Sequence, residues 1–361
     1  MPSCCSSMSL MNEQHWRPLE EMPRCCGNPL GMGVMRSSAD DFQVDEVLGF
    51  EADGEGEHLL VQVRKRDSNT HWVAGQLARA AGIPPRDVSY AGLKDRHAVT
   101  TQWFSLLMTG KETPDWSGLP ADAIEIMAVH RHRRKLRIGA LRGNRFQIVL
   151  RELTADRAAL ETRLQELRKT GMPNYFGEQR FGHDYQNLQQ FDQVLSTDRR
   201  RMDRKLRGLL ISAARSQLFN EVLAERIALG NWDRPLAGEY FMLEGSRSGF
   251  AGDPDDSALE TRCLTQDIHP TGPLWGRGRP PVTAEAASLE ERVLAPFDAW
   301  RNGLEHLGLM QERRPLRVRL ADLDWQFLDG ETLALNFFLP AGSFATVLLR
   351  ELMEISSPTA Y

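Results

Sequence analysis

The order of hydrophobic patterns along the chain is the feature that most constrains its fold. Over residues 40–67, and again over 314–352, apolar side chains recur in the short alternating runs that are typical of β-strands. The chain between them has helical periodicity over about 187–196 and 203–230, followed by a Gly/Pro-rich segment. Strand-forming segments on both sides of a helical and Gly/Pro-rich segment indicate one sheet built from both ends of the chain. The sequence therefore predicts an α+β protein with an inserted domain.

The chain length fits this division, because 361 residues are about twice the length of a usual domain. Residues 1–30 are polar and without periodicity, so we expect a mobile tail there. The discontinuous sheet domain is then expected over 31–168 and 312–361, and the inserted domain over 169–311.

Two helices are expected within the first part of the sheet domain. Asn69 or Thr70 begins one of them, and Gly82 ends it. Thr154 begins the other, and Gly171 ends it. The segments "DVSYAGL" and "TTQWFSLLM" have strand character, so the residues that join them form a loop.

Cysteine usage indicates a reducing compartment and no metal site. The five cysteines are an odd number, and no CxxC has a second pair or a histidine at zinc-site spacing. The N-terminus lacks a basic stretch followed by an apolar core, and no run approaches the roughly 18 apolar residues of a membrane span. We therefore expect a cytoplasmic protein without a membrane partner. The cysteines are Cys4, Cys5, Cys25, Cys26 and Cys263.

Positive charge is concentrated in one stretch of an otherwise acidic chain. The net charge of −5 excludes a generally basic protein, so a nucleic acid would have to be bound by local patches. Residues 130–146 contain no acid, and their unopposed cations repel one another unless a polyanion is bound. The alternative is a solvated strand edge. A second basic run, residues 198–207, is partly offset by its own acids. The cations of the first stretch are Arg131, Arg133, Arg134, Lys135, Arg137, Arg142 and Arg145.

One acid, Asp95, stands between Lys94 and Arg96 in the expected loop, where a sheet edge can hold a reactive group firmly. The flanking cations keep its carboxylate ionised, so it is a surface ion pair, a charge near a phosphate, or a nucleophile. The chain has no GxSxG, P-loop or HExxH motif and no convincing GxGxxG that would supply another catalytic apparatus. A single carboxylate without a metal or cofactor suits nucleophilic or acid–base work at a carbon centre.

Three phenylalanines stand next to polar or glycine residues rather than inside apolar runs. They are Phe42 in "DDFQV", Phe146 in "GNRF" and Phe344 in "AGSF". Most aromatic residues in such places are still core side chains. The alternative is a face on which a flipped or single-stranded base stacks, because every base offers a π-surface.

The sequence resembles the TruD family of tRNA pseudouridine synthases over about residues 29–353. The resemblance lies in eight blocks that occur in the order of the family, and "GLKD" together with "PNYFGEQRFG" is specific to it. The blocks are "DDFQVDEVLGFEADGEGEH", "NTHWVAGQLA", "SYAGLKDRHAVTTQWFSL", "GNRFQIVLR", "PNYFGEQRFGHD", "RSQLFNEVLAERI", "HPTGPLWG" and "LPAGSFATVLLRE".

This resemblance implies a pseudouridine-synthase-type catalytic domain, which is a mixed curved sheet with flanking helices, interrupted by an inserted α/β TRUD domain. It implies isomerisation of uridine 13 in the D stem of certain tRNAs, with tRNA as the partner. No cofactor is implied, because the product is an isomer of the substrate. No protein partner is implied either, and we expect a monomer.

The family's motifs also imply roles for single residues. Asp95 would be the nucleophile, Phe42, Asn144 and Phe344 would bind the base, and Phe146 would line the same pocket. The uridine must leave the helix, because its C1′–N1 bond and C5 are unreachable when the base is stacked. Asp95 would then attack C1′ of the ribose or C6 of the base, and the sequence leaves both open. The freed uracil would turn and rejoin through C5, with the Asn144 amide at its edge.

One departure from the family pattern concerns the charge near Asp95. The family often has a Lys and a Pro shortly before the "DF" block, where this chain has Arg36 and Ala39. If Arg36 takes the place of the lysine in the substrate site, the geometry changes, because a guanidinium can bind a carboxylate bidentately. Contacts to the RNA backbone are expected from Lys94, Arg96, Arg131, Arg133, Arg134 and Lys135.

Two other classes of function fit parts of the sequence. A tRNA-binding chaperone would use the same basic surface and would not need Asp95. A metal-dependent nuclease would need clustered ligands, for which Glu55, Glu57 and His58 are the only candidates. Activity in excess chelator that leaves RNA length unchanged and alters uridine chemically supports the isomerase alone.

Overall fold

The computed structural model describes residues 15–196, 203–253 and 255–358. The chain divides into two compact units. The sheet unit comprises Arg24–Asn174 and Arg317–Tyr361, and the insert unit comprises Met1–Pro23 and Tyr175–Leu316. None of the helices in the described part of the chain is long and apolar enough to cross a membrane.

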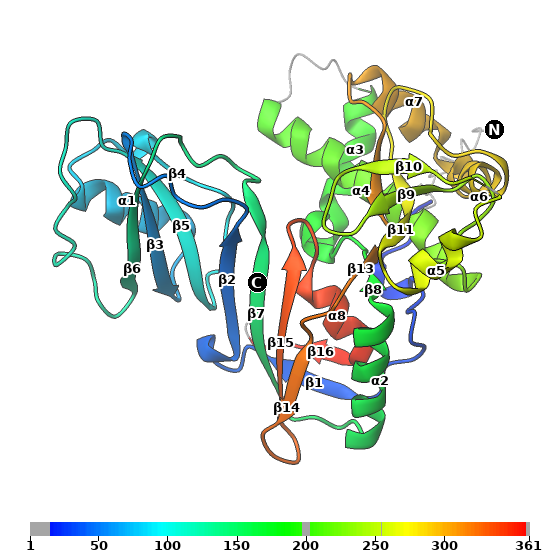
Figure 1. The fold of residues 1–361 in the computed structure, drawn as a ribbon, viewed down its shortest axis with the longest axis horizontal. Helices are drawn as coiled ribbons and strands as arrows, with labels where there is room; N and C mark the ends of the chain where they lie inside the picture. The colour runs from blue at the N-terminus through cyan, green and yellow to red at the C-terminus, as the bar shows by residue number, and fades with distance from the viewer. Residues whose placement is uncertain (1–14, 197–202, 254, 359–361) are drawn as a thin grey trace, which may run out of the picture. The chain divides into compact units, whose positions relative to one another are not determined.

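The sheet unit is built around a mixed sheet with the strand order β14-β15-β7-β2-β5-β3-β6, to which β1, β4 and β16 add at the sides (Figure 1). The pairs β2–β5 and β1–β16 are parallel, and the other pairs are antiparallel. Strands from the C-terminal segment pair with β7, so both ends of the chain contribute to one sheet, as the hydrophobic patterns predict. The bounds are β1 Met32–Met35, β2 Phe42–Leu48, β3 His58–Arg66, β4 Val88–Tyr90, β5 Val99–Leu107, β6 Ile124–His132, β7 Leu141–Arg151, β14 Asp324–Phe327, β15 Leu333–Pro340 and β16 Glu354–Ser356.

Helices cover one face of each half of this sheet. Alternate residues of β2, β7 and β15 form a core with α2 (Arg157–Thr170) and α8 (Ala345–Leu352). Alternate residues of β3 and β5 form a second core with α1 (Thr70–Ala80), which includes Val61, Phe104 and Leu77. Burial of these apolar stripes stabilises both halves of the sheet.

The predicted helix ends agree with the structure at three of four places. Asn69 caps α1 by accepting a hydrogen bond from the Trp72 backbone N–H, and Gly82 follows the helix with a φ of +59°. Gly171 ends α2 with a φ of +82°. The predicted start at Thr154 is wrong, because the Asp156 carboxylate caps α2, while the Thr154 hydroxyl accepts from the Met32 backbone N–H.

The insert unit contains an antiparallel sheet with the order β10-β9-β11-β12, against which the long helix α4 packs. Three of these strands lie in the segment 231–290, which the sequence predicts to be irregular. The single helix predicted over 287–307 is two helices, because Pro296 lacks the N–H that a continuous helix needs. The bounds are α3 Gln186–Ser196, α4 Arg204–Ala228, β9 Tyr240–Leu243, β10 Gly249–Ala251, α5 Ala258–Leu264, β11 Ile268–Leu274, α6 Ala284–Leu294, α7 Asp298–His306 and β12 Glu312–Pro315.

The segment before residue 24 is held against the insert unit from residue 15 onward. Trp16, Leu19 and Met22, spaced three residues apart, are buried. The Arg17 backbone N–H donates to the Glu221 carboxylate at 2.9 Å. The predicted tail over 1–30 thus includes an apolar stripe that the structure places in a core. Cys4 and Cys5 lie outside the described residues.

Candidate active site

Asp95 lies in the loop between β4 and β5, as the sequence predicts, and its side chain is 40% exposed. The Arg36 guanidinium donates one hydrogen bond from Nη2 to Asp95 Oδ2 at 2.9 Å. Arg36 is itself buried, and its Cζ lies 4.0 Å from the centre of the Phe42 ring. The carboxylate is therefore open to a substrate while a buried cation fixes one of its oxygens.

Phe42, over which Arg36 lies, packs against Phe146 in the core of the sheet unit. They are 3% and 8% exposed, and their ring centres are 6.2 Å apart in a T-shaped arrangement. Phe146 also stacks on Phe337 at 5.3 Å. Their sequence neighbours are polar because alternate residues of a strand lie on opposite faces of the sheet. The polar neighbours of Phe42 therefore do not indicate exposure of its ring.

Lys65 at the end of β3 binds the backbone of the loop that carries Asp95. Its side chain is fully buried, and its Nζ donates to the backbone carbonyls of Asp95 at 2.8 Å and Ser68 at 2.6 Å. Burial lowers the pKa of Lys65 to about 8, and the charge of Asp95 opposes that shift. An ammonium group in this position fixes the backbone that carries Asp95.

Two further buried side chains hold the same loop. The Thr70 hydroxyl accepts from the Lys94 backbone N–H at 3.0 Å and donates to the Gln102 side chain at 3.0 Å. The Gln102 amide donates to the Gly92 carbonyl at 2.6 Å. Together with Lys65, these contacts satisfy the backbone of the loop with partners in β3, α1 and β5. Satisfied buried networks of this kind make a loop rigid.

Lys94 does not extend toward solvent, as an RNA contact would. Its ammonium lies 2.7 Å from Glu46 Oε1, and its side chain is only 9% exposed. The other Glu46 oxygen accepts from the Trp103 backbone N–H at 2.9 Å. Burial raises the pKa of Glu46, and the charge of Lys94 opposes this. The placement of Lys94 therefore favours a structural role within the loop over contact with a phosphate.

Lys65 and Glu46 were not among the predicted site residues, although the sequence contains a signal for both. Lys65 follows Leu59, Val61 and Val63 in the same alternation, and Glu46 follows Phe42 and Val44 in another. A charged residue at the inward position of an alternating strand is buried, and buried charges are paired or functional.

Asn144 and Phe344 lie near the end of β7 that adjoins Glu46. Asn144 is the register partner of Glu46, and its Oδ1 is buried without a hydrogen-bond partner among the described residues. Phe344 immediately precedes α8 and is half-buried. The connection from β15 to Phe344 is fixed by a hydrogen bond from the Ala341 N–H to the Arg142 carbonyl at 3.1 Å.

The basic stretch is opposed by acids from elsewhere in the chain. Arg133 forms an ion pair with Glu55 and donates its backbone N–H to Asp53. Arg131 donates to the Lys111 carbonyl. The expectation of unopposed cations is therefore wrong for Arg133, and also for Arg145, whose Nη2 lies 3.7 Å from Asp322 Oδ2. The remaining predicted contacts that are exposed are Arg96, Arg134 and Lys135.

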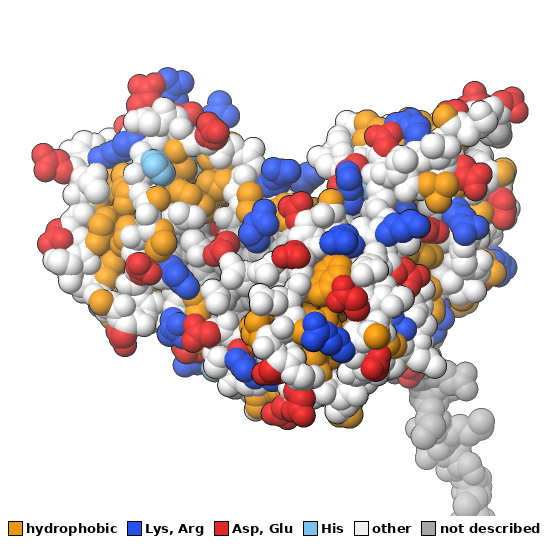
Figure 2. Space-filling model, turned by 60° about the horizontal axis from the view of Figure 1, so that its bottom comes forward, with side chains coloured by type: hydrophobic (Ala, Val, Ile, Leu, Met, Phe, Trp, Pro, Cys, Tyr) orange, Lys and Arg blue, Asp and Glu red, His pale blue; other side chains and the backbone are white. Residues whose placement is uncertain are grey.

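Charge on the surface is mixed rather than continuous. Figure 2 shows one face of the molecule on which Lys and Arg side chains alternate with Asp and Glu side chains around hydrophobic patches. RNA binding would therefore depend on local groups of cations, as the net charge predicts. Part of the second basic run, residues 198–202, lies outside the described residues.

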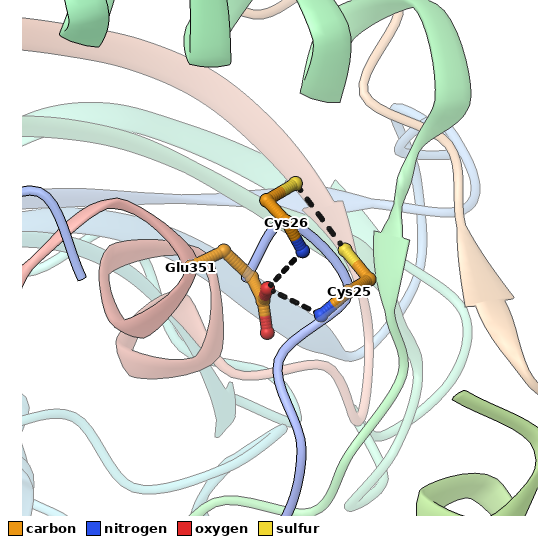
Figure 3. A group of neighbouring side chains, drawn as sticks. All are labelled: Cys25, Cys26 and Glu351. Carbon is orange, nitrogen blue, oxygen red and sulfur yellow. Dashed lines mark hydrogen bonds between the residues drawn. The ribbon is translucent and has the colours of Figure 1, made fainter. Parts of the chain in front are cut away.

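Among the described residues, Cys25, Cys26 and Glu351 form one group whose ligand atoms lie close enough to hold a metal ion. Figure 3 shows the Glu351 carboxylate against the backbone nitrogens of both cysteines, which donate to it at 2.8 and 3.3 Å. The hydrogen bond with Cys26, and then burial, raise the pKa of the Cys25 thiol, whereas metal ligation needs thiolates. This group is explained as an anchor of residues 25–26 on α8.

Comparison with known proteins supports the sequence resemblance. Residues 25–195 and 185–352 match the sequence model of a family described as tRNA pseudouridine synthase D (TruD). A tRNA pseudouridine synthase D from Methylococcus capsulatus is 48% identical over 335 residues, which cover 93% of this chain and 95% of that protein. Another from Nitrosococcus oceani is 49% identical over 328 residues, covering 90% and 92%.

A solved structure supports the fold independently. The crystal structure of the putative tRNA pseudouridine synthase D (TruD) from Methanosarcina mazei superposes with a TM-score of 0.70, at 22% identity, over 90% of this chain and 94% of that one. This confirms the predicted α+β fold with a mixed sheet. The family match covers most of the chain, and the relatives share nearly half of its residues. This chain therefore belongs to the TruD family of tRNA pseudouridine synthases.

Proposed function

We propose that this chain converts uridine 13 in the D stem of tRNA to pseudouridine, with Asp95 as the nucleophile. Family membership supports the coarser statement, that it is an isomerase acting on uridine in tRNA. One observation carries the assignment of Asp95. Its carboxylate is exposed and paired with Arg36, on a loop whose backbone is bound by Lys65 and other buried polar side chains. Preorganisation of this kind lowers the cost of reaching a productive geometry.

The proposed reaction balances without a cofactor. An Asp95 oxygen attacks C1′ of the flipped nucleotide, the C1′–N1 bond breaks, and its electron pair leaves with the uracil. The uracil turns, its C5 attacks C1′, and the bond from C1′ to the Asp95 oxygen breaks to restore the carboxylate. The proton on C5 is then lost, and N1 gains a proton. Addition of Asp95 to C6 of the base is the alternative first step, and the same pocket serves both.

Asn144 is the residue that would recognise the uracil edge in this proposal. Its buried Oδ1 has no partner among the described residues, and the N3–H of uracil is a donor that would satisfy it. Phe42 and Phe146 enter the proposal as the apolar floor of the base pocket, because both rings are almost fully buried. Phe344, which is half-buried, is the aromatic residue that would contact the base face.

The test is chemical mapping of pseudouridine in tRNA after incubation with wild-type protein or Asp95→Asn, both in excess chelator. Asp87→Asn is a matched control, because Asp87 is, like Asp95, a half-buried aspartate in the same unit. We expect modification in the D stem with wild type and Asp87→Asn, and none with Asp95→Asn. Modification by Asp95→Asn at the wild-type rate would contradict the role of Asp95. Tight tRNA binding without modification by any variant would instead favour the chaperone.

A further inference from the structure

A pocket of about 460 Å³ lies where the sheet of the sheet unit opens. Strands β2 and β5 pair over only three residues, Gln43–Asp45 with Val99–Thr101. Beyond them, the Glu46 carboxylate takes the Trp103 backbone N–H that a neighbouring strand would otherwise bind. The volume lies within the range of ordinary ligand sites, about 300–1,000 Å³. The lining residues include Leu48, Phe50, Leu60, Trp103 and His130.

Aromatic side chains form the walls of this pocket, and their positions are fixed. Trp103 and His130 lie 6.1 Å apart with their rings 34° from parallel. Phe50 stacks on His132 at 5.0 Å, and His132 Nδ1 lies 2.8 Å from an Asp53 carboxylate oxygen. Phe50 is nevertheless 36% exposed, and His130 is exposed. Preformed aromatic faces that are open to solvent suit a flat ligand.

The basic stretch is anchored beside the same pocket. Leu136 is buried in a small cluster with Leu60 and Ala91, against which Trp103 packs. The cations around Leu136, which are Arg134, Lys135 and Arg137, are exposed. Since Leu136 is held at the pocket, these charges lie close to it. A ligand with a flat apolar part and adjacent negative charges would meet both features, and a nucleotide has both.

The pocket is also connected to the catalytic loop. Glu46 lines the pocket and pairs with Lys94, the residue before Asp95. Ala91, at the start of the loop, accepts from the Gly139 backbone N–H at 2.9 Å, which ties the basic stretch to it. An RNA chain that reaches Asp95 would therefore have further nucleotides near this pocket.

We propose that the pocket binds an unpaired base of the same RNA whose uridine Asp95 modifies, by stacking on Trp103 and His130, while Arg134 and Lys135 contact the neighbouring phosphates. The inference rests on the proposed function, because it takes the RNA substrate as the ligand. Glu51 also lines the pocket, and its carboxylate would accept from the amino group of adenine, cytosine or guanine.

The test compares Trp103→Ala and His130→Ala with Trp72→Ala, a matched control on α1 that removes a tryptophan which is 39% exposed. We expect tRNA affinity to fall about tenfold in Trp103→Ala and severalfold in His130→Ala, since stacking of one base on an aromatic side chain supports an effect of that size. Trp103→Phe, which keeps an aromatic face, and Trp72→Ala should bind as wild type does. A short single-stranded RNA with one 2-aminopurine should lose its fluorescence on binding to wild type and retain it with Trp103→Ala.

The outcomes separate this inference from the proposed function. Pseudouridine formation by wild type, with an unchanged tRNA affinity in His130→Ala and no quenching of 2-aminopurine, would overturn the pocket alone. Weaker tRNA binding by His130→Ala, without pseudouridine formation by wild type, would support the pocket and overturn the proposed function. His130 is exposed, so its variant decides the matter even if Trp103→Ala fails to fold.

Discussion

Lys65 donates a hydrogen bond from its Nζ to the backbone carbonyl of Asp95 at 2.8 Å, from a position with no solvent exposure. The ammonium group binds the Ser68 carbonyl as well, so it links the end of β3 to the loop that carries Asp95. A buried lysine that forms no ion pair within the described part of the chain is costly, and the cost here is offset by the order that it gives to the loop.

We expect Lys65→Met to lower kcat about 10- to 100-fold with little change in KM. A hydrogen bond from a charged group contributes about 1.5–3 kcal/mol, and here it positions Asp95 rather than the RNA. Single-turnover kinetics on tRNA would measure the effect. Lys111→Met is the matched control, because the Lys111 ammonium also donates to a backbone carbonyl, that of Gly82, but is exposed. A rise in KM with kcat unchanged would show that Lys65 does not position the proposed nucleophile.

The same lysine makes stability depend on pH in the alkaline range. Burial lowers the pKa of Lys65 from 10.5 to about 8, so between these values the unfolded chain binds more protons at this lysine than the folded protein does. The contribution of Lys65 to the free energy of unfolding therefore rises with pH. The cost of burying the ammonium is fully present below about pH 8 and is relieved as pH approaches 10.5.

We therefore expect wild type to gain roughly 3 kcal/mol of stability relative to Lys65→Met between pH 8 and 10.5. Urea unfolding at both pH values would measure it, and other titrating groups cancel in the comparison. The free energy of unfolding of Lys111→Met should change with pH as that of wild type does. A constant difference between wild type and Lys65→Met at all pH values would mean that Lys65 keeps its ordinary pKa.

Arg36 contacts both Asp95 and Phe42, and these contacts predict graded effects. It donates to Asp95 at 2.9 Å and lies 4.0 Å over the Phe42 ring. Arg36→Met removes the counterion of the proposed nucleophile and should lower kcat/KM about 10- to 100-fold. Arg36→Lys keeps the charge but loses the planar contact with the Phe42 ring. Its kcat/KM should therefore lie between those of Arg36→Met and wild type.

A matched control for this pair is Arg66→Met, because Arg66 also binds an aspartate, Asp40, but at the surface. Exposed pairs contribute about 0–1 kcal/mol, so this variant should retain activity. Equal losses in Arg36→Lys and Arg36→Met would show that the guanidinium plane, and not the charge, is what Asp95 needs.

The parts of the fold that the sequence predicts are those that depend on neighbours along the chain. The Asn69 cap, the stop at Gly171 and the loop that carries Asp95 each follow from a few adjacent residues. The contribution of both chain ends to one sheet follows from hydrophobic alternation, which is also local. These features could be predicted because a short pattern is sufficient to specify them.

The missed parts of the site depend on residues that the fold brings together. Lys65 reaches the Asp95 carbonyl over a separation of 30 residues, and the acid that opposes Arg133 is 78 residues away. Alternation places Lys65 on the buried face, but it does not say that a loop lies there. The burial of Phe42 agrees with the more common placement of such aromatic residues, because its polar neighbours lie on the other face of the sheet.

The ion pair of Arg133 with Glu55 changes which cations should control RNA binding. Arg134 and Lys135 are exposed, and neither has an acid within ion-pair distance among the described residues. The double change Arg134→Gln/Lys135→Gln should therefore weaken tRNA binding and flatten the salt dependence. Each lost phosphate contact removes about 0.7–0.9 from the slope of log K against log salt, so the double variant should lose between one and two.

Arg133→Gln supplies the contrast, and Arg79→Gln on α1 supplies the control. Arg133→Gln removes a cation that Glu55 already neutralises and leaves the Glu55 carboxylate unpaired. That carboxylate would repel the RNA phosphates, so tRNA affinity should fall. The slope of log K against log salt should change less. Titrations at four salt concentrations would separate the two effects. If the slope falls as much in Arg133→Gln as in a single Arg134→Gln variant, then Arg133 leaves Glu55 when RNA binds and contacts a phosphate.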